Sequence, residues 1–400
     1  MKEHLEPIQS AEGLQSLAQK LTAERSFAFD TEFIRESSFF PQVELIQVAT
    51  REEAWMIDLQ AFQNGKAYDR EALRPLIEAF QNPNVLKIVH AAQADQECLY
   101  HVLGVVADPV FDTAVGGSLC GYGDSVGLAS LLQSVLDVSI KKGHARTNWA
   151  QRPLPKQLKE YALQDVIYLV ELGERLLEIL EEKERKDWAL KASRKWSDPV
   201  LFQVRTDELY QKLARGGRVD AKGHGVLYRL IEWRENRVRE LNVPRRWLAD
   251  DSVLLDVARV RPKDLSHLLS FRGLNKGEIR KNGDQLLALI REGEEFQPPA
   301  VERIRHSKRG AAVNPRALEL LKCFLAMLAD QNEISARQLV STENLTQLLL
   351  VSASSPEVWV QKNLLSEATC QLIGEELFDF IHGKRSLILQ SGAVEVRKVT

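Results

Sequence analysis

Two carboxylates stand two residues apart near the start of the chain, inside a segment with the pattern of a β-strand. Residues 26–33 read SFAFDTEF and contain Asp30 and Glu32. Because a strand repeats every two residues, both side chains point to one face, about 6–7 Å apart. Grouped carboxylates favour a hard divalent cation, which takes oxygen ligands. For this tripeptide taken alone, two solvated acids on an outer strand face are the alternative.

Three further residues have the chemistry to act with that pair. Tyr161 and Asp165 lie four residues apart in a helical pattern, which places them on one helix face. A phenol beside a carboxylate can orient a water molecule for attack. Asp95 stands at the start of a helix that follows an apolar strand. Taken one at a time, a packed tyrosine and a capping aspartate are the simpler interpretations.

The segments that position these residues alternate between strand and helix signals. Strand patterns occupy 26–33, 43–49, 54–58 and 85–89, with a short apolar stretch at 109–111. Helix patterns occupy 70–80, 93–103 and most of 113–180. This order predicts a mixed α/β sheet layer rather than a TIM barrel.

The second half of the chain is expected to be helical, with no strand after Lys183. Gln297-Pro298-Pro299-Ala300 and the basic residues that follow read as a linker between two helical units. The tail after Arg385 has no clear pattern.

Charge is divided unevenly along a chain of ordinary globular composition. The 400 residues are 44% hydrophobic and 27% charged, and the length favours two or three domains. Residues 1–180 carry 16 Lys and Arg against 25 Asp and Glu, whereas the net charge of the whole chain is only −3. The first half could therefore hold cations and the second half a polyanion. The alternative is that the difference in charge between the two halves serves solubility alone.

Several classes of protein are poorly supported by the sequence. No apolar run approaches the ~20 residues of a membrane span, and the N-terminus MKEHLEPIQS has no secretory core. The four cysteines form no C-x-x-C pair, so neither a thiolate zinc site nor a disulfide framework is expected. A reducing cytoplasm is the expected compartment.

Arginines concentrate on one predicted helix of the second half and at its end. They are Arg229, Arg234, Arg237, Arg239, Arg245 and Arg246. Arginine suits phosphate through its bidentate fork, but a solvated face threaded with glutamates is an equally weighted alternative. The linker residues Arg303, Arg305, Lys308 and Arg309 could clamp a strand or keep the linker soluble.

As a set, these motifs resemble the ribonuclease D family, within the DEDD superfamily of 3′→5′ exonucleases. The resemblance is carried by FAFDTEFIRESSFFPQVELIQVA, Ile57-Asp58, HAAQAD at 90–95, FDT at 111–113, RTNW at 146–149 with RPL at 152–154, and YALQD at 161–165. The second half resembles HRDC domains through ADDSVL at 249–254, Arg261-Pro262, KNG at 281–283 and, more weakly, residues 372–378.

The resemblance implies three domains. An α/β ribonuclease H-like exonuclease domain, with a mixed central sheet and flanking helices, is expected over 1–195. Two all-α HRDC-type domains are expected to follow, over 205–295 and 312–385.

The resemblance also implies a catalytic site of the tyrosine subgroup that binds two divalent ions, Mg²⁺ or Mn²⁺. Asp30 would bridge both ions, Glu32 and Asp165 would complete the shell of the first, and Asp95 would serve the second. Tyr161 would position the attacking water. Phe33, Phe111 and Trp149 could stack on bases, although aromatic residues in such elements are more often core.

The implied activity is 3′→5′ exonucleolytic removal of nucleotides from RNA, with release of 5′-monophosphates. The expected partner is RNA with a single-stranded 3′ end, with precursor tRNA as the family substrate and a role in tRNA 3′ maturation. No membrane and no obligate protein partner are expected. A 3′→5′ DNA exonuclease and a non-catalytic nucleic-acid-binding scaffold are the alternatives, and the filled set of five site residues disfavours the scaffold.

Overall fold

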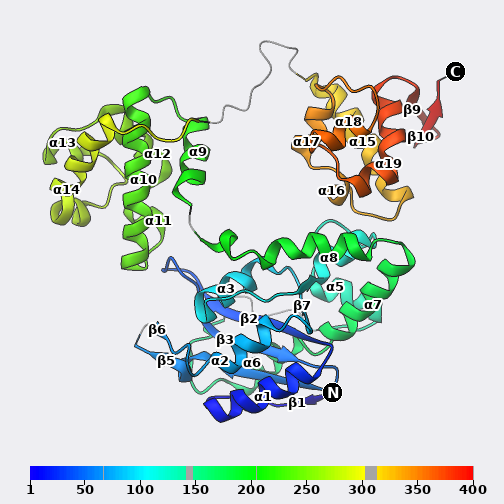
Figure 1. Cartoon of the computed structure of the whole chain (residues 1–400), viewed down its shortest axis with the longest axis horizontal. Helices are drawn as coiled ribbons and strands as arrows, with labels where there is room; N and C mark the ends of the chain where they lie inside the picture. The colour runs from blue at the N-terminus through cyan, green and yellow to red at the C-terminus, as the bar shows by residue number, and fades with distance from the viewer. Residues whose placement is uncertain (66, 141–146, 204, 302–312, 400) are drawn as a thin grey trace.

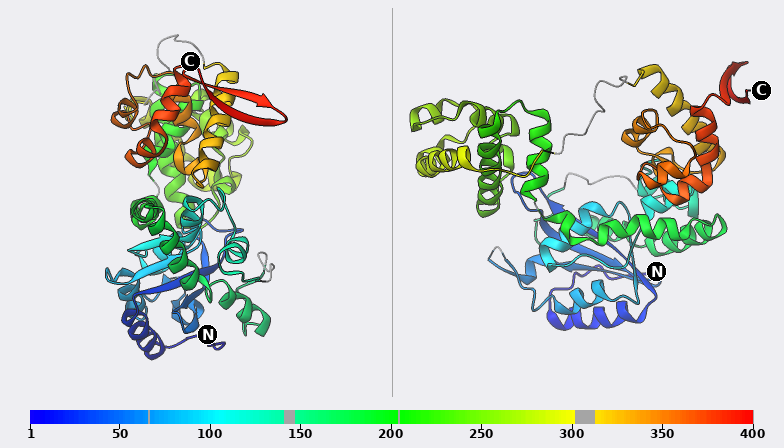
Figure 2. Two further views of the ribbon diagram at one scale, coloured as in Figure 1. Left: turned by 90° about the vertical axis from the view of Figure 1, so that its right-hand side faces the viewer. Right: turned by 45° about the horizontal axis from the view of Figure 1, so that its top comes forward.

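The computed structural model describes every residue except 66, 141–146, 204, 302–312 and 400. An N-terminal region built on one β-sheet carries two helical regions on the same side, as Figures 1 and 2 show. Within the described residues, none of the helices combines the length and apolar character needed to cross a membrane.

The sheet of the N-terminal region has six strands in the order β1-β4-β3-β2-β7-β8. Its strands are β1 (Lys2–Glu3), β2 (Ser26–Ile34), β3 (Gln42–Ala49), β4 (Glu53–Asp58), β7 (Leu86–Val89) and β8 (Val110–Asp112). The strands β2, β3 and β4 form an antiparallel meander, whereas β7 and β8 run parallel to β2. The mixed sheet expected from the sequence is therefore confirmed.

Helices cover both faces of this sheet. Phe27 and Phe29 of β2 point to the face covered by α1 (Ala11–Ala23), α2 (Arg74–Gln81) and α3 (Gln93–Leu103). The opposite face is covered by α4 (Thr113–Leu119), α5 (Leu128–Leu136), α6 (Lys156–Gln164), α7 (Leu169–Glu182) and α8 (Lys186–Arg194). Alternation along β2 thus sends its aromatic residues one way and its two carboxylates the other.

The helical expectations for this region needed two adjustments. The helix expected over 70–80 begins only at Arg74, because the Asp69 carboxylate accepts the N–H groups of Glu71 and Ala72 and holds a turn there. The described part of the helical stretch expected from 113 to 180, which leaves out 141–146, is divided into four helices. Gly121 and Gly123 adopt positive φ in the first break, a conformation that ends a helix.

The first helical region comprises α9 (Thr206–Gly216), α10 (Ala221–Leu241), α11 (Arg245–Leu248), α12 (Asp251–Val260), α13 (Leu265–Ser270) and α14 (Lys276–Glu295). It meets the sheet region through the loop after β2. The side-chain oxygen of Asn242 accepts the N–H groups of Phe39 and Phe40 at 3.1 and 3.0 Å. Phe39 is 8% exposed and packs into the core of this helical region.

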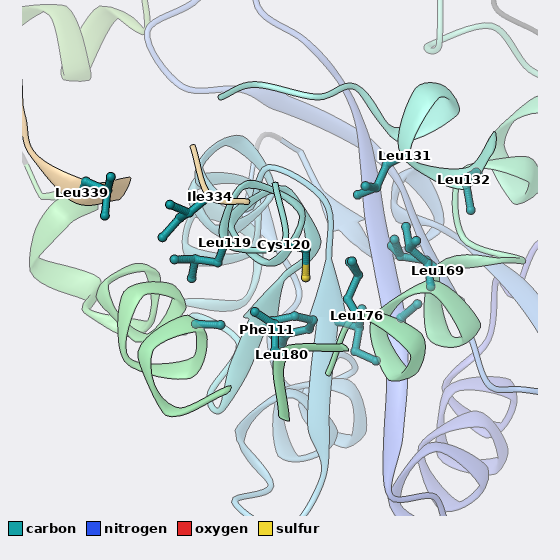
Figure 3. Close-up of a cluster of buried hydrophobic side chains, with 14 of the residues drawn as sticks. Phe111, Leu119, Cys120, Leu131, Leu132, Leu169, Leu176, Leu180, Ile334 and Leu339 are labelled. Atoms are coloured by element: carbon teal, nitrogen blue, oxygen red, sulfur yellow. The ribbon is translucent and has the colours of Figure 1, made fainter. Parts of the chain in front are cut away.

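The second helical region comprises α15 (Pro315–Gln331), α16 (Ala336–Leu339), α17 (Thr342–Leu348), α18 (Glu357–Gln361) and α19 (Glu367–Ile381). Its core continues into the sheet region, because Ile334 and Leu339 belong to the same buried cluster as Leu119 and Phe111, and Figure 3 shows Ile334 beside Leu119. The Arg185 guanidinium donates to the carbonyl oxygens of Asn332 and Glu333 at 2.6 and 3.0 Å. This helical region is therefore fused to the sheet region by a shared core.

The expectation of a tail without pattern was wrong. Two antiparallel strands, β9 (Arg385–Gln390) and β10 (Ala393–Lys398), form a hairpin at the C-terminus. Ser391 and Gly392 both adopt positive φ, as the tight two-residue turns of hairpins require. Each strand has only six residues, and β9 holds the apolar run Leu387-Ile388-Leu389 instead of an alternating pattern, so the sequence signal was weak.

Candidate active site

Three of the five predicted site residues meet on the sheet face that carries α6. Asp30 and Glu32 come from β2, and Asp165 follows directly after α6. One carboxylate oxygen from each residue lies within 4.8 Å of the other two. The same-face placement predicted from the spacing of the strand pair is therefore observed.

Asp95 lies in the first turn of α3, beside Thr31 of β2. Its Oδ1 atom accepts the Thr31 N–H at 3.1 Å and the Thr31 hydroxyl at 2.6 Å. Thr31 points away from the faces of Asp30 and Glu32, as the strand period requires. Asp95 is only 6% exposed, and its charge acts on both carboxylates of β2.

The carboxyl groups of the site repel one another in a poorly solvated setting. Burial, followed by the charges of the neighbouring acids with Asp95 first, raises the pKa of Asp30 well above its ordinary value. Burial and then the charge of Asp165 raise the pKa of Glu32 to about 9. Burial also raises the pKa of Asp165 to about 6, and that of Asp95 to about 7 despite the hydrogen bonds from Thr31.

No cationic side chain of the described residues forms an ion pair with these four acids. Clustered carboxylates of this kind are unfavourable unless positive charge is supplied. Their oxygens are the ligands that hard divalent cations take. The donor set therefore fits a divalent metal centre at Asp30, Glu32 and Asp165, with Asp95 adjacent.

Tyr161 reaches the same group of acids from α6. Its hydroxyl is hydrogen-bonded to Asp165. Burial and then the negative charge of Asp165 raise the pKa of Tyr161 to about 12, so the phenol stays protonated at neutral pH. Its ring lies beside that of Trp149, with centroids 6.2 Å apart. The hydroxyl is thus a hydrogen-bond donor held at the edge of the carboxylate cluster.

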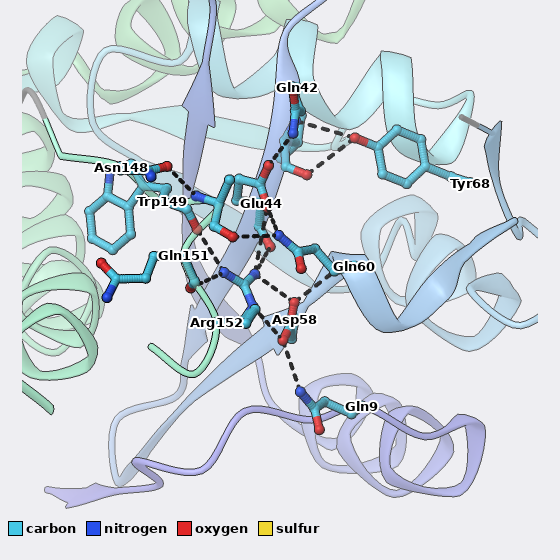
Figure 4. A network of polar contacts seen from close by, with 12 residues as sticks. Gln9, Gln42, Glu44, Asp58, Gln60, Tyr68, Asn148, Trp149, Gln151 and Arg152 are labelled. Carbon is cyan, nitrogen blue, oxygen red and sulfur yellow. Dashed lines mark hydrogen bonds and ion pairs between the residues drawn. The ribbon is translucent and has the colours of Figure 1, made fainter. Parts of the chain in front are cut away.

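A buried polar network fixes the segment that leads into α6, as Figure 4 shows. The Arg152 guanidinium bonds both oxygens of Asp58, at 2.8 and 2.6 Å, and donates to the Trp149 carbonyl at 2.7 Å. Gln60 donates to the carboxylate of Glu44 at 2.7 Å and to the Ala150 carbonyl at 3.0 Å. The network holds the backbone of Trp149 in place. Because the Trp149 ring lies beside the Tyr161 ring, the network also supports the position of Tyr161.

Two features of the site were missed at the sequence level. Gln47 on β3 is the register partner of Asp30 on the neighbouring strand β2. Its side chain is fully buried, and within the described part of the chain neither of its polar atoms has a hydrogen-bond partner. The period-two pattern could have placed it beside Asp30. The network around Arg152 joins residues 94 positions apart, and only the resemblance pointed to that segment.

The aromatic side chains considered for base stacking are mostly core. Phe111 is fully buried and Trp149 is 3% exposed, whereas Phe33 is partly buried against the α1–α3 side of the sheet. Neither Phe111 nor Trp149 is available to a base in this structure. The interpretation of these two residues as core is confirmed.

The arginines of α10 are largely engaged within their own helical region. Arg234 is 1% exposed and bonds Asp251 at 2.7 Å, and Arg237 bonds Glu278 at 2.5 Å. Arg234 and Arg237 are therefore occupied by acids rather than by phosphate, and the burial of Arg234 does not fit a solvated helix face either. The linker residues Arg303, Arg305, Lys308 and Arg309, and the motif residue Arg146, lie outside the described residues.

Comparison with known families matches the two parts of the chain separately. The family model described as a 3′-5′ exonuclease matches residues 5–181, which include all five site residues and every strand of the six-stranded sheet except β1. The HRDC domain model matches residues 224–290, within the first helical region.

Curated proteins named Ribonuclease D match over most of the chain. The protein from Gluconacetobacter diazotrophicus is 31% identical over 344 residues, which are 86% of each chain. The protein from Zymomonas mobilis is 30% identical over 388 residues, which are 95% of each chain.

Among solved structures, Escherichia coli RNase D, described as an exoribonuclease involved in structured RNA processing, superposes with a TM-score of 0.75 at 26% identity. The match covers 92% of this chain and 98% of that one. The catalytic core of RRP6 from Trypanosoma brucei superposes with a TM-score of 0.53 at 22% identity, over 72% of this chain and 78% of that one, a likeness of fold.

Proposed function

The chain belongs to the ribonuclease D family and is a 3′→5′ exoribonuclease, and on that premise we propose that it hydrolyses RNA from the 3′ end with two divalent metal ions, releasing 5′-monophosphates. One observation carries the mechanistic part of the proposal. Three carboxylates present oxygens within 4.8 Å of one another and form no ion pair with a described cationic residue.

We propose Asp30, Glu32, Asp95 and Asp165 as the metal ligands. Bound divalent ions would supply the positive charge that stabilises the attacking and leaving oxygens of an in-line phosphodiester displacement. The charges of Asp95, Glu32 and Asp165 all act on Asp30, which suits Asp30 to hold both ions. Asp95 keeps its Oδ2 atom available, because the hydrogen bonds from Thr31 go to Oδ1.

Tyr161 is proposed as the residue that orients the attacking water. Its protonated hydroxyl can donate one hydrogen bond and accept another, and the bond to Asp165 fixes its direction. The Trp149 ring and the Arg152 network limit movement of the phenol. Groups that position or transfer protons in this way are typically worth about 10²–10⁴-fold in rate.

The proposal extends to substrate, location and domain organisation. RNA with a single-stranded 3′ end is the substrate, and precursor tRNA is the proposed natural one, in line with the structured-RNA role described for the E. coli relative. A cytoplasmic location follows from that substrate. We assign residues 1–195 to the exonuclease domain, and 205–295 and 312–385 to two HRDC-type domains.

The experiment compares one RNA labelled at either end, with and without chelator. We expect the 3′ label to leave as a 5′-mononucleotide at once, while the 5′-labelled strand shortens stepwise. Chelator should abolish both events, and added Mg²⁺ or Mn²⁺ should restore them. Full activity in chelator would refute the metal-ion mechanism, and early release of the 5′ label would refute the polarity.

A further inference from the structure

A cavity of about 710 Å³ lies where the sheet region meets the first helical region. One wall is the exposed side of α3, from Gln93 to Gly104, beside the loop after β2. The other wall is the short helical stretch η3 (Pro199–Phe202), the start of α9 and Arg245 of α11. Figure 1 shows α3 beneath the point at which the chain leaves for α9.

The charged side chains that line the cavity are predominantly cationic. Five are basic, namely Arg35, Arg70, Arg205, Lys212 and Arg245, and two are acidic, namely Glu97 and Glu208. Arg35 pairs with Glu97, Arg205 with Glu208, and Arg245 with Glu235, which lies outside the lining, while Arg70 donates to the backbone carbonyls of α3. Lys212 is exposed and makes no ion pair with a described residue. The cavity therefore has a surplus of positive charge suited to phosphates.

Aromatic rings line the same cavity on both sides of the junction. Phe40 stacks on His101 with centroids 4.7 Å apart, and Tyr100 lies 6.3 Å from Phe202. All four are only partly buried, so part of each ring is open to the cavity. Cationic grooves with aromatic rings are the arrangement by which proteins hold single-stranded nucleic acid without reading its sequence.

Two residues of the cavity lining lie close in sequence to carboxylates of the site. Arg35 follows Glu32 by three residues at the end of β2, and Gln93 precedes Asp95 by two residues on α3. From there the lining runs along α3, whose 11 residues span roughly 16 Å at about 1.5 Å per residue. A strand whose 3′ end lies at the carboxylates could continue into this cavity.

We propose that this cavity, the junction cleft, binds the single-stranded RNA that lies 5′ of the nucleotide being removed. The proposal rests on the exoribonuclease function and names the surface that holds its substrate. Phosphates meet Lys212 and Arg205 on α9, and bases contact Tyr100 and Phe202. The first helical region thus grips RNA through its contact with α3, while the arginines of α10 remain paired within their own region.

The test measures the affinity of the full-length protein for two RNAs in chelator, where no cleavage occurs. The tetranucleotide is too short to extend beyond the catalytic end, whereas a strand of about 20 nucleotides fills the cleft. In Lys212→Glu, we expect Kd for the long RNA to rise by about tenfold, with a flatter salt dependence. Kd for the tetranucleotide should stay within about twofold of wild type.

Two further variants separate charge from structure. Lys276→Glu makes the same charge reversal on an exposed residue of α14 outside the cleft, and it should leave both affinities unchanged. Phe202→Ala should weaken only the long RNA, because it removes a ring from the cleft wall.

Cleavage of both RNAs is then followed in Mg²⁺. The proposal predicts an unchanged single-turnover rate at saturating long RNA for Lys212→Glu. Equal Kd values for wild type and Lys212→Glu on the long RNA would overturn the cleft, and so would an equal loss with Lys276→Glu. If the wild-type protein binds both RNAs but cleaves neither in Mg²⁺, the catalytic proposal fails while the binding comparison still decides the cleft.

Discussion

Helix α3 borders two regions of opposite charge. At its first turn Asp95 adjoins the carboxylate cluster, where burial raises the pKa of all four acids and the charges of neighbouring acids raise those of Asp30 and Glu32 further. Along its exposed side runs the junction cleft, where basic side chains outnumber acidic ones. The first region needs cations from solution, and the second attracts an anionic strand. We therefore expect changes in the carboxylate cluster to alter the rate of RNA hydrolysis, and changes in the junction cleft to alter the affinity for RNA.

Removing one charge from the cluster should have the largest effect. Asp30→Asn deletes the carboxylate on which the charges of the three other acids act, so the single-turnover rate should fall by more than about 10³-fold, the upper range for one electrostatic contact. Affinity for RNA in chelator should not fall, because a repulsive charge is lost. Glu78→Gln, an exposed acid of α2, is the matched control and should behave as wild type. A strong loss of RNA affinity in Asp30→Asn would show that the cluster also determines RNA binding, which contradicts the separate roles given to the cluster and the cleft.

Tyr161→Phe sharpens the comparison within the catalytic region. The substitution keeps the ring against Trp149 and removes only the hydroxyl that bonds Asp165. Turnover should fall by about 10²–10⁴-fold, while RNA affinity and melting temperature stay near wild type. A wild-type rate in Tyr161→Phe would leave the carboxylates alone to carry the reaction. Stability lost in Tyr161→Ala without a rate effect in Tyr161→Phe would identify a core residue.

Arg152 should have a smaller effect, because it acts through another residue. Arg152→Lys keeps a charge for Asp58 but loses the planar fork that also reaches the Trp149 carbonyl. A supporting contact of this kind is typically worth about 10–100-fold in activity. On the Tyr161→Phe background, Arg152→Lys should lower the rate little further. Independent losses in the double variant, tracked with thermal melting, would show a role in stability alone.

The smallest predicted effect concerns stability without metal. The folded cluster keeps protons that the unfolded chain loses near pH 4, so unfolding free energy falls as pH rises from about 4 to about 9, the pKa of Glu32. The melting temperature in chelator should therefore drop over that range by a few degrees more than in Glu32→Gln. Adding Mg²⁺ or Mn²⁺ at the alkaline end should recover it. Identical dependence of the melting temperature on pH for wild type and Glu32→Gln would mean that the pKa of Glu32 is not raised in the folded protein.

The sequence predicted the catalytic region better than the junction cleft for a physical reason. Asp30 and Glu32 share a face by strand geometry, and Tyr161 precedes Asp165 by one helical turn. Asp95 comes close to β2 only through the packing of α3, which no local pattern predicts. Only the resemblance to a family brought Asp95 into the set of site residues.

The cleft carries no comparable local signal. Its lining comes from the loop after β2, from α3, from η3 and from α9, and these segments meet only when two regions pack together. From the sequence, phosphate binding was one of two equally weighted interpretations of the arginines along α10. In the fold, acids distant in sequence, such as Glu278 and Asp251, pair with two of these arginines. Lys212, which pairs with no acid in the described part of the chain, stood out only once those partners were known.

The central claim is that the carboxylate cluster holds two divalent ions, and anomalous diffraction from crystals soaked in Mn²⁺ tests it most directly. The account predicts two peaks about 3.5–4 Å apart, bracketed by Asp30, Glu32 and Asp165, with Asp95 beside one of them. Asp30→Asn crystals should lose at least one peak. No manganese among these carboxylates, or two undiminished peaks in Asp30→Asn, would contradict the account.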